Sequence, residues 1–315
     1  MKHTIISWDC SFRNFFHLID AVEKQNYNKS EYELVFVEQR TREIADAYNH
    51  QFGLKSLWDR YQEVRDNFNF RVIYLNHPLA EPYHLGRSNN VGLEIANGEI
   101  ISIMDGDILI HPNFLKCLDV AHYEHNAVIN LARHYASRPV RARFDNWTEG
   151  VIDFDLCLAE CPDTDKPIPR AVNNKGPLIS APREWWFAVG GYDKHRIWAT
   201  GISRLGQDVT TRLEIYSGRE SLALPGQFCV HPYHPAGFDR GADLEKMVLS
   251  IQEELIIWSR QNREYSHRKR QYIQERLYKK YQWVFNANIS GDFTILTHIK
   301  LKLQKVLSRM RIRSA

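Results

Sequence analysis

The feature that most constrains the fold is a regular alternation of short apolar runs and segments with helical periodicity, which continues as far as Leu131. The apolar runs, predicted to be strands, are Thr4–Trp8, Glu33–Val37, Phe70–Leu75, Glu99–Met104 and Ala127–Leu131. The predicted helices are Phe12–Gln25, Glu43–Phe52, Leu57–Phe68, Gly86–Ala96 and Pro112–Val120. Strands that alternate with helices pair in parallel through right-handed crossovers. The pattern therefore predicts an α/β fold with a doubly wound, mostly parallel sheet.

Two acidic clusters follow predicted strands directly, and ligands of such sheets bind beyond the carboxyl ends of the strands. Glu38-Gln39 follows the second strand, and Asp105-Gly106-Asp107 follows the fourth. Carboxylate oxygens are hard ligands that suit Mg²⁺ or Mn²⁺, and these ions bind phosphate oxygens in turn. The central glycine allows a diphosphate to come close. Taken alone, the triplet is more typical of a simple turn at a strand end than of a metal site.

The second half of the chain is less regular. The segment 133–175 is predicted to be a long excursion of loops with one short helix at Asp153–Ala159, and such segments often line substrate sites. Further elements are predicted as the helices Pro182–Val189 and Gln207–Ser217 and the short strands Ser221–Leu224 and Phe228–Val230.

From Leu244 onward the sequence is charged and predicted to be helical, with amphipathic segments at Lys246–Arg260 and Lys269–Trp283. We therefore divide the chain into a domain of residues 1–240 and a C-terminal helical extension of residues 241–315. The tail from Ile295 contains six cations and no acidic residue. A basic amphipathic helix of this kind can lie on an anionic membrane surface, so residues 295–315 are a candidate peripheral membrane contact. The alternative for the tail is a solvated terminal helix.

Composition excludes several classes of function. The net charge of +3 is too small to indicate a nucleic-acid partner. The five cysteines are odd in number and show no paired zinc spacing, which is typical of free thiols in a reducing compartment. No run of about 20 apolar residues is present, and the N-terminus does not resemble a signal peptide. The expected location is the cytoplasm.

Three sequence blocks together resemble the inverting family-2 glycosyltransferases of the GT-A fold. The first block, Leu85–Asp107, reads LGRSNNVGLEIANGEIISIMDGD and ends in the Asp-x-Asp motif of that family. The second comprises Gly190-Gly191-Tyr192-Asp193 and the segment Gly206–Leu213, in which Gln207-Asp208 stands where the family has Glu-Asp. The third is His231-Pro232-Tyr233-His234-Pro235. The blocks occur in the family's order, and the resemblance covers roughly residues 1–240.

The resemblance implies a transfer of sugar from a nucleotide-sugar, with a UDP-sugar as the first expectation, to an acceptor hydroxyl of a glycan or glycolipid. It implies Mn²⁺ or Mg²⁺ as cofactor and Asp208 as the catalytic base. Asp107 would bind the metal with His231 and His234, of which His234 is the first candidate, and Asp105 would bind the metal or the ribose. The implied donor contacts are Glu38, Arg87, Asn90, Asp105 and Asp107, and the candidate acceptor contacts are Trp185, Trp186 and Trp198.

One further departure and three alternatives accompany this interpretation. The family's second strand usually ends in Asp-Gly-Ser, whereas this chain has Val37-Glu38-Gln39-Arg40, which leaves the nucleotide base open. A nucleotidyltransferase would carry a glycine-rich basic loop after the first strand, and Cys10–Asn14 contains no glycine. An inactive, glycosyltransferase-like binding protein would be expected to lose Asp208 or an acid of the triplet. A metal-dependent hydrolase would show a dense His/Asp cluster.

Overall fold

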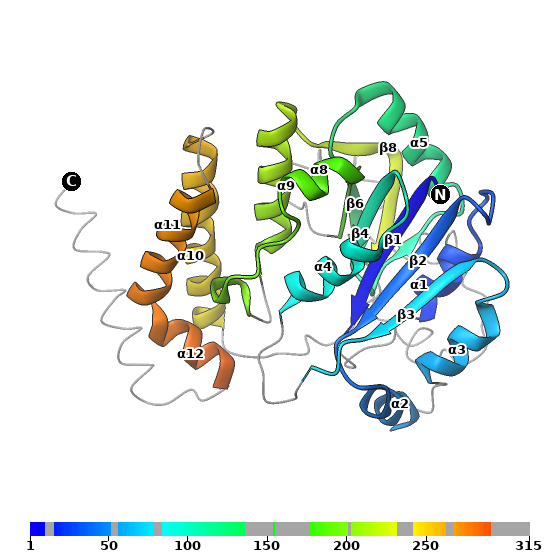
Figure 1. Cartoon of the computed structure of the whole chain (residues 1–315), viewed down its shortest axis with the longest axis horizontal. Helices are drawn as coiled ribbons and strands as arrows, with labels where there is room; N and C mark the ends of the chain where they lie inside the picture. Colours follow the sequence, from blue (N-terminus) through cyan, green and yellow to red (C-terminus); the bar gives the residue numbers. More distant parts are fainter. Residues whose placement is uncertain are drawn as a thin grey trace. The chain divides into compact units, whose positions relative to one another are not determined.

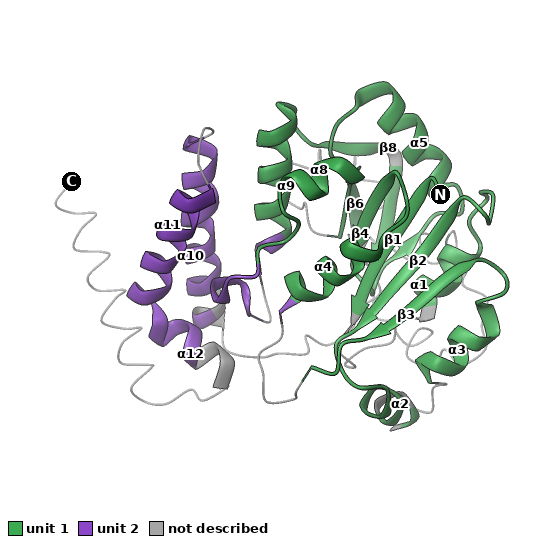
Figure 2. Ribbon diagram, in the orientation of Figure 1, with its two compact units in different colours: residues 1–81, 85–193, 206–235 green, residues 82–84, 194–205, 236–315 purple. Residues whose placement is uncertain are grey.

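The structure is a computed structural model that describes residues 1–9, 16–51, 56–77, 84–135, 154, 177–200, 203–231, 242–262 and 267–290. The chain forms two compact units (Figure 2). Unit 1 contains residues 1–81, 85–193 and 206–235, and unit 2 contains residues 82–84, 194–205 and 236–315. The predicted boundary after residue 240 thus lies close to one crossing between the units. Residues 194–205, which include Trp198, belong to unit 2 although the sequence pattern assigned them to the first domain.

Unit 1 is built on a mixed sheet whose described strands have the order β3-β2-β1-β4-β7-β6-β8-β5 (Figure 1). The strands are β1 His3–Asp9, β2 Tyr32–Glu38, β3 Asn69–Tyr74, β4 Ile100–Met104, β5 Leu109–Ile110, β6 Ile129–Tyr135, β7 Leu178–Pro182 and β8 Leu222–His231. β3, β2, β1 and β4 run parallel to one another, as do β6 and β8. β7 pairs antiparallel with β4 and β6, and β5 pairs antiparallel with β8.

The helices of unit 1 occupy the predicted connections. They are α1 Phe16–Glu23, α2 Arg42–Gln51, α3 Leu57–Val64, α4 Leu85–Ile95, α5 Phe114–His125, α8 Arg183–Ala188 and α9 Leu205–Ser217. In unit 2 the described elements are η1 Arg196–Trp198, α10 Ala242–Gln261, α11 His267–Lys280 and α12 Gln282–Ser290. No described helix is long and apolar enough to cross a membrane.

All five strands predicted in the first half of the chain are confirmed, and the differences lie in the antiparallel part of the sheet. β5 is only two residues long, and β7 ends at a proline directly before α8. Neither segment therefore shows an alternation of apolar and polar residues from which a strand could be predicted. The two short strands predicted within 221–230 form the single strand β8. The predicted loops of 133–175 are wrong for residues 133–135, which continue β6. The rest of that segment, with its predicted short helix, lies outside the described residues except for Phe154, which is buried.

Helix α4 packs closely on the central strand because it presents a glycine to the sheet. A Cβ added at Gly92 would lie 2.4 Å from Cγ2 of Ile6 on β1. Real Cβ atoms do not approach so closely, so any larger residue would push the helix away from the strand. Gly92, one of the glycines of the Leu85–Asp107 block, therefore has a packing role that lets α4 lie close against β1.

The turn between α4 and β4 is organised by a buried carboxylate. The side chain of Glu33, 2% exposed, accepts hydrogen bonds from Thr4 Oγ1 at 2.7 Å and from the backbone N–H of Asn97 at 2.8 Å. Arg71 forms an ion pair with Glu33 at 2.6 Å and donates to the carbonyl of Ile95 at 2.8 Å. Buried polar groups need such partners to avoid a large desolvation penalty. The network thereby sets where β4 begins, and hence where it ends at Asp105.

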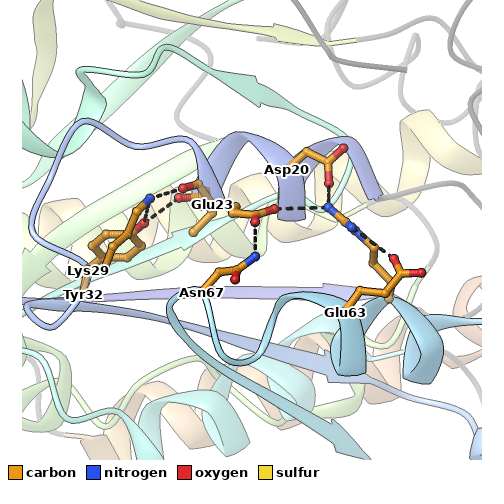
Figure 3. A network of polar contacts seen from close by, with 8 residues as sticks. Asp20, Glu23, Lys29, Tyr32, Glu63 and Asn67 are labelled. Atoms are coloured by element: carbon orange, nitrogen blue, oxygen red, sulfur yellow. Dashed lines mark hydrogen bonds and ion pairs between the residues drawn. The ribbon is translucent and has the colours of Figure 1, made fainter. Parts of the chain in front are cut away.

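A second polar network joins α1 to α3 at the side of the sheet (Figure 3). Arg60 on α3 contacts Asp20 and, at 3.2 Å, Glu23, both on α1, and it also bonds to Glu63 at 3.2 Å. Asn67 Nδ2 donates to Glu23 at 2.6 Å. Because the Arg60 side chain is only 20% exposed, these contacts are partly shielded from solvent. They hold the two helices together above the core of β1, β2 and β3.

Unit 2 is held together through a buried amide. Gln252 on α10 is fully buried, accepts a hydrogen bond from the backbone N–H of Arg204 and donates to the carbonyl of Ile197, both at 2.8 Å. On α11, Tyr278 stacks on Phe285 of α12 with ring centroids 5.4 Å apart. Residues 194–205 are therefore joined to the C-terminal helices by specific contacts, which explains their assignment to this unit.

Candidate active site

The candidate site lies where the strand order of the sheet reverses. From β1 the chain proceeds outward to β2 and β3, then returns to place β4 on the other side of β1. In open α/β sheets such a switch point is the usual ligand site. Asp105-Gly106-Asp107 follows β4 directly at this point, with Asp107 buried and Asp105 about a quarter exposed.

Neighbouring backbone fixes the Asp-Gly-Asp turn on both sides. The N–H of Asp105 donates to the carbonyl of Pro177 at 3.0 Å. After the turn, Leu109 on β5 pairs with Val230 on β8, so the backbone of His231 comes next to the residues that follow Asp107. The side chain of His231 and all of His234 lie outside the described residues, and their metal ligation stays a prediction.

The donor chemistry of this turn fits a magnesium or manganese ion. Among the described residues no three His, Cys, Asp or Glu side chains gather as a complete cage. Mg²⁺ in nucleotide sites, however, is usually held by one or two carboxylates together with substrate phosphates and water. Asp105 and Asp107 supply two such carboxylates, so the described residues fit an ion that binds together with a diphosphate.

A basic residue that the sequence analysis did not single out lies beside this turn. Arg133 on β6 places Nη1 3.6 Å from Oδ2 of Asp105, and its side chain is only 15% exposed. It pairs in register with Cys229 on β8. Burial raises the pKa of the Cys229 thiol, Arg133 opposes this shift, and Asp105 and Asp107 add to it. The predicted strand stopped at Leu131, and only its continuation to Tyr135 places Arg133 at the site.

The first and second sequence blocks meet through Asn90 and Tyr192. Asn90 Nδ2 donates to the carbonyl of Tyr192, and the N–H of Tyr192 donates to Asn90 Oδ1, both at 2.8 Å. Gly190 and Gly191 have φ of 75° and 64°, and a Cβ at Gly191 would lie 2.5 Å from Asn90 Oδ1. Asn90 therefore positions the Gly-Gly-Tyr turn. Its predicted contact with a donor stays a prediction.

Tyr192 in turn lies between the Asp-Gly-Asp turn and α9. Burial raises the pKa of its phenol, the charge of Asp105 raises it further, and Arg212 opposes the shift. Arg212 Nε forms a buried ion pair with Asp208 Oδ2 at 3.0 Å, and its Nη1 donates to the carbonyl of Val189 at 2.8 Å. The predicted base Asp208, which is 1% exposed, is thus joined through Arg212 to the turn that carries Tyr192.

Two predicted donor contacts, Glu38 and Arg87, lie on β2 and on helix α4 in the part of unit 1 where the strands run parallel. Glu38 ends β2, is fully buried, and accepts a hydrogen bond from the backbone N–H of Arg40 at 2.7 Å. Arg87 lies in the first turn of α4 and is exposed. An exposed guanidinium at a helix start is well suited to a phosphate. Contact of either residue with a nucleotide stays a prediction.

The three tryptophans predicted as acceptor contacts are all buried. Trp186 is fully buried, donates from Nε1 to the carbonyl of Ile101 at 3.1 Å, and stacks on Tyr192 at 5.8 Å. Trp198 is fully buried in unit 2. Trp185 is 7% exposed and meets Tyr216 at the far end of α9 from Asp208. The observed contacts of Trp186 are packing contacts, and stacking of any of the three rings on an acceptor sugar stays a prediction.

Comparison with solved structures identifies the fold. One is the TarS fragment 1–349 of S. aureus in complex with UDP-GlcNAc, which matches with a TM-score of 0.57 and 16% identity over 95% of this chain and 78% of that chain. Another is the mannosyltransferase PcManGT of Pyrobaculum calidifontis in complex with GDP-Man and Mn²⁺, with a TM-score of 0.54 and 14% identity over 98% of this chain and 80% of that chain. The chain has the GT-A fold.

At these identities the likeness establishes the fold and leaves the chemistry to the site. No protein-family model and no curated protein matches the sequence. The fold-level expectation of a GT-A sheet is confirmed, and its Asp-Gly-Asp turn lies at the predicted edge.

Proposed function

We propose that this protein is a metal-dependent, inverting glycosyltransferase that uses a nucleotide-sugar donor. The observation that carries the proposal is the Asp105–Asp107 turn directly after β4, at the switch point of a GT-A sheet. The buried Asp208–Arg212 pair supports it, because Arg212 bonds to the carbonyl of Val189 next to the Tyr192 turn that Asn90 holds. Fold alone does not assign an activity, but carboxylates placed at this point have a defined task in sugar transfer.

The donor is proposed from the site and from the ligands of similar structures. One similar structure holds UDP-GlcNAc and another holds GDP-Man with Mn²⁺. A nucleotide-sugar diphosphate carries negative charge that a carboxylate-bound divalent ion and Arg87 would compensate. Glu38, at the end of β2, is the proposed contact to ribose or base. Because the two donors differ in base and sugar, the identity of both is left to experiment.

A divalent ion held by Asp107 and Asp105, with His231 and His234 as further proposed ligands, would supply Lewis-acid stabilisation of the leaving diphosphate. The protein's own contribution is to position the groups. Asn90 holds the Tyr192 turn, and Arg212 fixes the carboxylate of Asp208. Preorganised groups of this kind contribute because they need no rearrangement during the reaction.

Asp208 is proposed to take the proton of the acceptor hydroxyl. As the acceptor oxygen forms its bond to the anomeric carbon, the bond from that carbon to the diphosphate oxygen breaks and the electron pair leaves with the diphosphate. A single displacement of this kind inverts the anomeric centre. The proposed acceptor is a glycan or glycolipid hydroxyl, which places the enzyme in polysaccharide or glycoconjugate synthesis. Contact of residues 295–315 with a membrane surface belongs to the same proposal.

The test is nucleotide release from a panel of UDP-, GDP- and dTDP-sugars, with and without Mn²⁺. Three variants accompany the wild type: Asp107→Ala, Asp208→Asn and the control Asp66→Asn, whose side chain is 89% exposed. We expect slow, Mn²⁺-dependent hydrolysis of one donor, lost in Asp107→Ala and unchanged in Asp66→Asn. With an acceptor present, Asp208→Asn should lower transfer by at least about 100-fold, the usual contribution of a general base.

Nucleotide binding separates failure of the chemistry from failure of the site. If the wild type binds a nucleotide in the presence of Mn²⁺ but turns over no donor, the binding-protein alternative replaces the enzyme. If it neither binds nor turns over any donor, the proposed site is wrong.

A further inference from the structure

The outward side of α11 in unit 2 carries an unusual concentration of positive charge. Its inward side is defined by the buried residues Arg270, Gln274 and Leu277. Glu275 marks one edge of this inward side, because it bonds to His195 of η1 at 3.2 Å. The same His195 ring meets Tyr278 edge-on, with centroids 5.7 Å apart. These contacts define one half of the helix circumference, and the groove with α10, which Arg276 and Lys280 also line, borders that half.

Five cations and one tyrosine, which we call the basic stripe, occupy the other half. They are Arg268, Lys269, Tyr272, Arg276, Lys279 and Lys280, all of them exposed. At 3.6 residues per turn they fall within an arc of about 120° and extend over roughly 18 Å of the helix axis. No acidic residue of α11 lies within the arc, since its one acid, Glu275, lies at the margin and bonds to His195.

The charge of the basic stripe is local and not a property of the whole chain. The net charge of all 315 residues is only +3, so five cations on one helical face stand out from a nearly balanced surface. Tyr272 is 63% exposed near the middle of the arc, with the Arg276 guanidinium 6.0 Å from its ring centroid. An amphipathic aromatic ring among cations is the combination found where proteins meet the headgroup region of membranes.

We propose that the basic stripe of α11 binds the surface of membranes that contain anionic phospholipid. The stripe is a convex helical face, which suits a flat array of headgroup phosphates. In the groove on its flank, between α10 and α11, Glu253 and Glu254 lie with Arg276 and Lys280, and Glu253 also pairs with Arg204 at 3.0 Å. The charges in the groove therefore offset one another, and the excess of positive charge lies on the convex face. The stripe is separate from the tail 295–315, although the sequence of that tail continues the same excess of cations.

The test is flotation of the full chain with phosphatidylglycerol/phosphatidylcholine vesicles and with pure phosphatidylcholine vesicles. The stripe variant is Arg268→Gln with Lys279→Gln. The matched control is Lys24→Gln with Lys116→Gln, which removes the same charge from exposed positions of unit 1. All three chains are compared by circular dichroism, and the stripe and control pairs are repeated with Lys300, Lys302 and Lys305 changed to Gln.

Each cation near an anionic surface contributes roughly fivefold to partitioning, so the stripe variant should bind the anionic vesicles about 25-fold more weakly than the wild type. The control should change binding less than about threefold, and added salt should weaken wild-type binding by screening. Three results would overturn the proposal: no binding of the wild type to anionic vesicles at low salt, equal binding of the stripe and control variants, or binding to polyphosphate in solution without binding to vesicles. None of these readouts uses a sugar donor, so they are independent of the proposed transfer reaction.

Discussion

The ion pair between Asp208 and Arg212 provides a quantitative test of how the candidate base is held. Its Nε and Oδ2 atoms are 3.0 Å apart, and the two side chains are 1% and 6% exposed. The perturbations are Arg212→Met, Asp208→Asn and the double variant. Removing the guanidinium leaves a buried carboxylate without its counter-charge and should cost about 3–5 kcal/mol of unfolding free energy. Asp208→Asn keeps a carbonyl for Arg212 and should cost about 1.5–3 kcal/mol.

The double variant should lose less than the sum of the two single losses. Once the carboxylate is neutral, losing the guanidinium no longer leaves a buried charge, so we expect a coupling free energy of about 2–3 kcal/mol. The pair Arg42–Asp46 on α2 is a matched control, because it has the same i,i+4 spacing with 47% and 20% exposed side chains and a distance of 3.4 Å. An exposed pair of this kind should show a coupling below about 1 kcal/mol.

The assay is urea unfolding followed by circular dichroism, together with hydrogen exchange of peptides from α9. Hydrogen exchange is needed because a chain with two units need not unfold in one step. Single variants at Asp208 and Arg212 whose losses add within about 0.5 kcal/mol would refute the reasoning. In that case the burial of the pair has no energetic consequence, and Arg212 does not position the base.

Three further outcomes are expected. Gly190→Ala should lower the free energy of unfolding by about 1–2 kcal/mol because its φ is left-handed. Gly191→Ala should lower it by about 1–3 kcal/mol more, because its Cβ would lie 2.5 Å from Asn90 Oδ1. Equal urea midpoints of the two variants would contradict this contact. Asn90→Ala should lower the free energy of unfolding by about 2–4 kcal/mol, because it leaves the N–H and the carbonyl of Tyr192 without their hydrogen-bond partner. Hydrogen exchange at residues 190–193 should become faster, and unchanged exchange would count against the prediction. Burial lowers the pKa of His122 to about 4. Between about pH 6.5 and pH 4 the unfolded chain therefore binds a proton at this residue that the folded chain does not. The free energy of unfolding decreases as the pH falls through this range, by at most about 1.4 kcal/mol per pH unit. His122→Gln, which can still bond to Ser180, should flatten this part of the profile in urea titrations at about pH 7 and pH 5, and an unchanged slope would exclude His122 as its source.

Much of the parallel half of the sheet was predictable from the sequence because its signals are local. β1 to β4 are buried apolar runs, and the helices between them show periodic apolar positions, so neither depends on a distant partner for recognition. The end of β4 at Asp105-Gly106-Asp107 follows from the same pattern. A doubly wound sheet has few allowed connections, which is why parallel pairing and the edge that carries the acids could be inferred.

The antiparallel strands and several site contacts could not be predicted, since their signals are not local. β7 exists because it pairs with β4 and β6, and the position of Arg133 beside Asp105 depends on β6 continuing past its apolar run. The tryptophans show the converse. Residue type indicates that Trp186 can stack on a sugar, but the approach of α8 to β4 buries its ring and satisfies its N–H.

The sequence by itself therefore determined the alternation of elements, the fold class and the edge of the sheet where the acidic turn lies. Only the tertiary structure decided that Asn90 clamps the Tyr192 turn, that Arg212 pairs with Asp208, and that residues 194–205 join the C-terminal helices. The physical reason is distance along the chain. Periodicity and turn chemistry act over a few residues, whereas the Asn90–Tyr192 contact joins positions 102 residues apart and forms only when the sheet has brought their segments together.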